Sequence, residues 1–116
     1  MITFAQGEIY ARKVDALPRE LVAFTEKDAS GAWIISHSES GHHHLIDGPG
    51  VTVMERTKDV PPGVRILYAI VDAPSQLRQN AVNAHESHGL DADSIYEVRI
   101  AREYDPFTEQ ARRVAD

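Results

Sequence analysis

The sequence contains no cysteine, which excludes disulfide bonds, thiolate-bound zinc and cysteine nucleophiles together. It also has no excess of basic residues. Twelve Lys and Arg stand against 18 Asp and Glu, and the formal net charge is −6. The average field of such a molecule repels a nucleic-acid backbone or an anionic bilayer. We therefore expect neither nucleic acid nor membrane among its partners.

Long hydrophobic runs are absent as well. No apolar segment approaches the roughly 18 to 20 residues of a membrane span, and the first ten residues have neither a basic region nor the apolar stretch of a signal peptide. What is present is a composition close to the globular average, with 42% hydrophobic and 26% charged residues among 116. We expect one domain spanning residues 1–116, not exported through a signal peptide.

β-Branched and aromatic residues are dense in six segments, which predicts strands over residues 7–14, 32–37, 42–46, 51–57, 64–71 and 95–101. The nearly continuous apolar run of 64–71 is typical of a strand covered on both faces, so it is placed centrally. A four-residue turn at 38–41 makes a hairpin of 32–37 and 42–46, which 51–57 extends to three strands. In 95–101, Glu97 and Arg99 alternate with apolar residues, which predicts one solvated face.

Helices are predicted in three places. Residues 19–24 suit a short helical turn, residues 75–88 follow an early proline and end at Gly89, and a short helix to residue 114 begins with Asp105 as N-cap. The predicted fold class is therefore α+β and β-rich: a small curled antiparallel sheet, barrel-like or sandwich-like, with two or three short helices.

The six histidines fall into two clusters, at 37–44 and 85–88. Residues two apart in a strand share a face, so His42 and His44 project together while His43 points away. With the turn at 38–41, His37 lies opposite His42 on the same face, which also carries Trp33, Ile35 and Ile46. This arrangement predicts imidazoles beside the core, where neutral rings suit a divalent cation.

The spacing of His85 and His88 places both rings on one face of the predicted helix. If that helix packs over the hairpin, a thiolate-free site forms that suits Zn²⁺, Fe²⁺, Mn²⁺, Ni²⁺ or Cu²⁺. The candidate ligands are His42, His44, His85 and His88. The candidate general bases for a metal-bound water are Glu86 and Glu39. Solvated histidines without a cation, and helix-end histidines beside the C-terminal dipole, are the alternatives.

Seven short motifs are spread along the chain: Gly7-Glu8, Val-Asp-Ala-Leu-Pro at 14–18, Ser-Glu-Ser-Gly-His-His-His at 38–44, His-Glu-Ser-His at 85–88, Tyr-Glu-Val at 96–98, Arg-Glu-Tyr-Asp-Pro at 102–106 and Arg-Arg-Val-Ala-Asp at 112–116. Together they resemble a group of small uncharacterised proteins associated with phages and prophages, over nearly the whole chain. The resemblance implies that the histidines belong together. We expect a cytoplasmic or virion-associated location. The resemblance implies no established reaction.

Two functions follow as hypotheses. The first is a metal-binding β-rich domain of a phage-like protein, with metal-dependent hydrolysis as the default reaction if the cation keeps an open position. The second is a non-enzymatic phage structural or assembly protein that acts as a homo-oligomer, with the histidines at a pH-sensitive interface.

Overall fold

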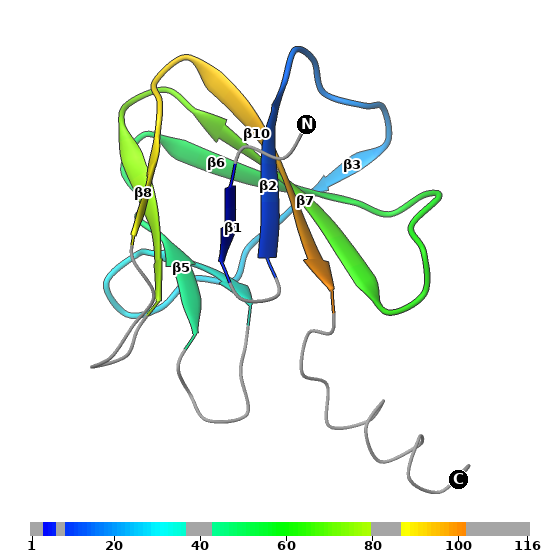
Figure 1. Ribbon diagram of the computed structural model, residues 1–116, viewed down its shortest axis with the longest axis horizontal. Helices are drawn as coiled ribbons and strands as arrows, with labels where there is room; N and C mark the ends of the chain where they lie inside the picture. Colours follow the sequence, from blue (N-terminus) through cyan, green and yellow to red (C-terminus); the bar gives the residue numbers. More distant parts are fainter. Residues whose placement is uncertain (1–3, 7–8, 37–42, 80–86, 102–116) are drawn as a thin grey trace, which may run out of the picture.

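The structure is a computed structural model that describes residues 4–6, 9–36, 43–79 and 87–101 (Figure 1). Within these ranges the chain is built of strands and turns. The strands are β1 (Phe4–Gln6), β2 (Ile9–Val14), β3 (Leu21–Ala23), β4 (Trp33–Ser36), β5 (His44–Ile46), β6 (Val51–Arg56), β7 (Val64–Val71), β8 (Ser75–Gln79), β9 (His88–Leu90) and β10 (Ser94–Ala101).

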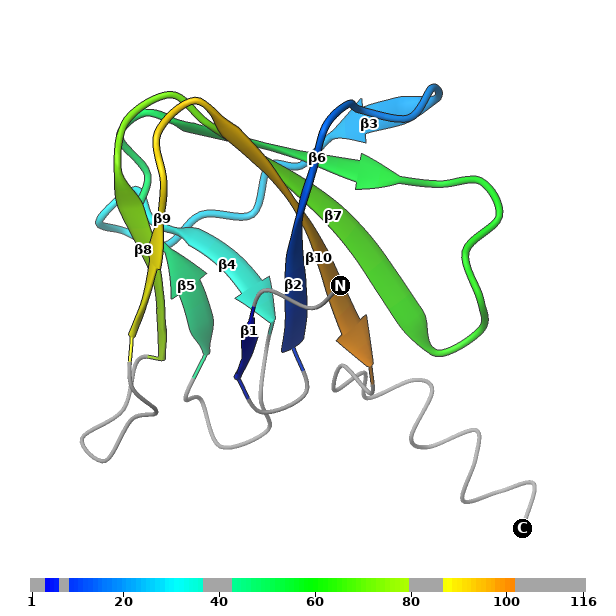
Figure 2. The same cartoon turned by 45° about the horizontal axis from the view of Figure 1, so that its top comes forward.

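The strands form two antiparallel sheets. The larger has the order β1-β2-β10-β7-β6-β3, and the smaller has the order β4-β5-β8-β9. Figure 2 shows the smaller sheet beside the long strands β2, β10 and β7. The chain crosses between the sheets at the connections β3–β4, β5–β6, β7–β8 and β9–β10. Sheet partners are consequently often distant in the sequence.

The hydrophobic core takes residues from both sheets. The larger sheet contributes every second residue of its central strands, and the smaller contributes Trp33, Ile35, Ile46, Leu77 and Leu90. The Trp33 indole Nε1 donates a hydrogen bond of 3.0 Å to the carbonyl oxygen of Val51, which joins the two sheets through a buried polar contact. Burial of this apolar surface is the main favourable contribution to the folding free energy of a chain without disulfides.

A corner beside Gly50 fixes where the chain passes between the sheets. Gly50 has a φ of 75°, and a Cβ there would lie 2.7 Å from the Cβ of Ala73 in the β7–β8 connection. The Asp72 amide donates to the Gly50 carbonyl across the same corner at 2.7 Å. Glycine is required here by both its backbone conformation and the close approach of the facing segment.

The predicted helices are the main error of the sequence interpretation. The described residues contain no helix, so the fold is all-β and the α+β class is wrong, although the β-rich character is confirmed. Residues 21–23 form β3 instead of a helical turn. The predicted helix 75–88 is replaced by β8 at its start and by the beginning of β9 at its end. The predicted helix 106–114 lies outside the described residues.

The strand predictions are largely confirmed. Residues 64–71 form β7 with those bounds, between β10 and β6. The three-stranded extension of the hairpin is wrong, because β6 pairs with β3 and β7 in the other sheet. The prediction that β10 has one solvated face is also wrong in part, since Glu97 is only 5% exposed. None of the described residues forms a helix of the length and hydrophobicity needed to cross a membrane.

Candidate metal centre

Two of the four predicted metal ligands lie in described strands. His44 is the first residue of β5 and is 8% exposed, and His88 is the first residue of β9 and is half-buried. His43 precedes β5 and is half-buried. The other two predicted ligands and both predicted bases, His42, His85, Glu39 and Glu86, lie outside the described residues, as does His37.

Strand pairing places His44 and His88 on the same face of the smaller sheet. His44 lies opposite Gln79 of β8, and His88 lies opposite Leu77 of the same strand. Residues two apart in a strand share a face, and directly opposed residues share it too. Leu77 belongs to the hydrophobic core, so this is the inward face. Histidines from separate parts of the sequence therefore share one core-facing surface.

The separation of the two histidines follows from the same register. One strand, β8, lies between them, and their partners on β8 are two residues apart. Two interstrand spacings and one two-residue step put the Cα atoms about 12 Å apart. At that span the two rings must lean toward each other to share one cation, and two imidazoles alone do not fill the four positions of a typical zinc site.

The segments that connect the strands at this end of the sheet contain further candidate metal ligands in their sequence. Ser36 ends β4, His44 begins β5, Gln79 ends β8 and His88 begins β9. Because these strands are antiparallel neighbours, all four residues lie at one end of the smaller sheet. Segments 37–42 and 80–86, which carry His42 and His85, are joined to the described strands at this same end.

A register shift in the hairpin changes which residue faces His44. The pairs Trp33↔Ile46 and Ile34↔Leu45 follow the register that a turn at 38–41 predicts. The next pair is Ser36↔His44, so the register shifts between Ile34 and Ser36. A bulge of this kind lets two residues of one strand oppose one of the other. Ser36 and His44, both buried, thus become direct neighbours. The predicted pair His37 and His42 lies outside the described residues.

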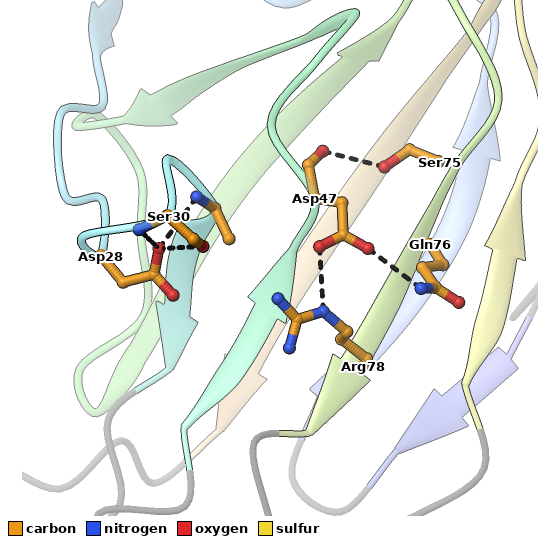
Figure 3. A network of polar contacts seen from close by, with 7 residues as sticks. Asp28, Ser30, Asp47, Ser75, Gln76 and Arg78 are labelled. Carbon is orange, nitrogen blue, oxygen red and sulfur yellow. Dashed lines mark hydrogen bonds and ion pairs between the residues drawn. The ribbon is translucent and has the colours of Figure 1, made fainter.

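A polar network around Asp47 holds β5 and β8 in this register. The Asp47 carboxylate follows β5 directly and accepts hydrogen bonds from Arg78 Nε at 2.9 Å and Gln76 Nε2 at 3.0 Å (Figure 3). The Ser75 hydroxyl donates to the Asp47 carbonyl oxygen at 2.9 Å. Three residues of β8 thereby bind one residue at the end of β5. The network stabilises the pairing that places His44 opposite Gln79.

The turn that leads into β4 is fixed by Asp28. Its Oδ1 accepts hydrogen bonds from the Ser30 hydroxyl at 2.6 Å, the Ser30 amide at 2.9 Å and the Ala32 amide at 3.0 Å. These donors, the Ser30 hydroxyl first, lower the pKa of Asp28 because each of them favours the charged carboxylate. An aspartate that binds the amides of following residues is a common turn-forming device, and here it orients the start of the histidine hairpin.

The described residues by themselves do not complete a metal site. Among them, no group of three or more His, Asp or Glu side chains has an arrangement that could hold a metal ion. Gln79 is the polar residue that the sequence analysis missed, since it lies beside His44 on the inward face. Because residues 75–88 were predicted to form a helix, Gln79 was not expected beside the core. In a strand, the alternation of Leu77 and Gln79 would have placed Gln79 there.

Comparison with known proteins gives a family but no activity. No curated protein and no solved structure matches the chain. The model of a family described as a domain of unknown function, DUF8820, matches residues 5–101, which include every described strand except the first residue of β1. This chain belongs to the DUF8820 family.

Proposed function

We propose that the protein binds a divalent transition-metal ion at the end of the smaller sheet, with His44 and His88 as ligands from β5 and β9 and His42 and His85 as the remaining ligands. The observation that supports the proposal is the register that puts His44 and His88 on one inward face. Histidines on that face are shielded from water, which favours the neutral imidazole that a cation requires. A site with nitrogen ligands and no thiolate suits Zn²⁺ among the divalent ions.

Hydrolysis would be an extension of this function. A bound cation with an open position lowers the pKa of its water, and a nearby carboxylate then serves as base. Glu86 and Glu39 are the carboxylates closest in sequence to the proposed ligands. The shared inward face of His44 and His88 bears on cation binding and not on hydrolysis.

The edges of the two sheets do not favour assembly by sheet extension. In the part of the chain that the structure describes, the outermost strands, β1, β3, β4 and β9, contain 3, 3, 4 and 3 residues. Edges this short offer few backbone groups to a second copy, which is how many proteins avoid edge-to-edge pairing. A homo-oligomer in the phage-assembly hypothesis would therefore need another surface.

Metal analysis of protein purified without an affinity tag tests the proposal. After reconstitution with Zn²⁺ and removal of excess metal, we expect close to one equivalent in the wild type, with large losses in His44→Ala and His88→Ala. His43→Ala is the matched control, because strand alternation directs residue 43 to the opposite face. Urea unfolding of each metal-free variant separates loss of a ligand from loss of the fold. Equal metal content in all four proteins, or none in the wild type, contradicts the proposal.

A further inference from the structure

The outer face of the larger sheet carries a buried carboxylate surrounded by arginines. Glu97 lies in the middle of β10, directly opposite Arg12 of β2 on one side and Tyr68 of β7 on the other. Its carboxylate accepts hydrogen bonds from Arg12 Nε at 3.0 Å, Arg12 Nη2 at 3.3 Å, Arg99 Nε at 3.0 Å and the Tyr68 hydroxyl at 2.9 Å. One acidic group thus orients two guanidinium groups and a phenol.

The charges around this carboxylate do not balance. Arg56 of β6 is on the same face, because it lies two residues from Met54, which is opposite Tyr68. Among the residues that the structure describes, three guanidinium groups and one carboxylate leave a formal excess of two positive charges on this face, in a chain whose net charge is −6. A local positive excess in an acidic protein attracts small anions selectively to that place.

Arg99 contacts the carboxylate of Glu97 through the Nε atom of its guanidinium group. Its contact with Glu97 uses Nε, so among the described residues the two terminal amino groups of the guanidinium are not committed to Glu97. The Arg12 and Arg99 side chains are 45% and 46% exposed, whereas the Glu97 side chain is 6% exposed. The acidic group is therefore beneath the two guanidinium groups, which remain accessible from solvent.

We propose that this outer face, the surface around Glu97 formed by Arg12, Arg56, Arg99 and Tyr68, binds a small phosphate-class dianion, with Arg99 and Arg12 as the binding residues and Glu97 as the positioning residue. A planar guanidinium fork matches two oxygens of a tetrahedral oxyanion, and an excess of two positive charges matches a dianion better than a carboxylate monoanion.

Titration with inorganic phosphate at constant ionic strength, followed by amide chemical shifts in NMR spectra, tests the site. We expect saturable shifts in β2, β7 and β10, weaker binding of acetate than of phosphate or sulfate, and at least about a tenfold loss of phosphate affinity in Arg99→Gln. Arg99→Lys keeps the charge but loses the fork, so a loss of similar size is expected.

Arg19→Gln is the matched control, because it removes one positive charge from an exposed residue in the β2–β3 connection. Its phosphate affinity should equal that of the wild type. Unchanged urea midpoints in the Arg99 variants exclude unfolding as the cause. The proposal is overturned if phosphate gives no saturable shifts, if Arg99→Lys binds like the wild type, or if Arg19→Gln loses as much affinity as Arg99→Gln.

Discussion

Replacement of Glu97 by glutamine gives the sharpest test of the energetics of this fold. The substitution keeps the shape of the side chain and removes its charge, so Tyr68 loses a charged acceptor at 2.9 Å in a buried place. A hydrogen bond to a charged group contributes roughly 1.5–3 kcal/mol. The arginine partners are nearly half exposed, so their ion pairs add little. We expect the free energy of unfolding to fall by about 2 kcal/mol.

The pH dependence of this loss has a definite sign. Burial by itself would raise the pKa of Glu97, but hydrogen bonds from Arg12, Arg99 and Tyr68 outweigh it, and the pKa lies below its ordinary value of 4.5. A carboxyl group with a lowered pKa in the folded state stabilises the protein above its unfolded pKa. That stabilisation disappears as the pH falls through the folded pKa. The difference between wild type and Glu97→Gln should therefore be full at neutral pH and shrink in acid.

Urea unfolding followed by circular dichroism measures these differences, with the slope m checked for constancy. Tyr68→Phe provides the second corner of a double-mutant cycle. If the buried Tyr68–Glu97 hydrogen bond dominates, Glu97→Gln costs less than about 1 kcal/mol in the Tyr68→Phe background. A cost that is the same in both backgrounds, or a wild-type advantage that persists at acid pH, would refute this account of the cluster.

Three further outcomes follow from the packing. Leu77→Ala removes a fully buried side chain from the core of the smaller sheet, and a loss of about 3 kcal/mol in urea unfolding is expected; a loss under about 1 kcal/mol would mean that β8 is not packed on the core. Gly50→Ala should lower the thermal midpoint more than Gly63→Ala, because both glycines have positive φ but only the first faces a close contact. Asp47→Asn weakens the contact with Arg78, so faster amide exchange in β5 and β8 is expected, and unchanged exchange would show that the network does not hold this pairing.

The prediction of β7 succeeded because its evidence is local. Of the eight residues Val64–Val71, all except Arg65 are apolar or aromatic and five are β-branched or aromatic, and a run of this kind suits a strand covered on both faces. The prediction for residues 75–88 failed for the opposite reason. Gln76, Arg78 and Gln79 have good helix propensity, but propensity is a weak prior that pairing with β5 and β9 overrides.

The candidate metal centre divides in the same way. Sequence spacing alone predicted that His44 shares a face with Ile46 and lies against the core, and both residues are buried in β5. No local pattern showed that His88 begins a strand two places away from β5 in the same sheet. The prediction that His42 and His85 complete a site with them remains untested, because both lie outside the described residues.

The sequence by itself determined where most strands form and which of their side chains turn inward, since the alternation of apolar residues is a property of each segment. The tertiary structure alone decided which strands become neighbours, because pairing depends on contacts between segments that the chain separates widely. In the tertiary structure β5 and β6 lie in different sheets, β9 lies in the same sheet as β5, and Glu97 lies between Arg12 and Tyr68.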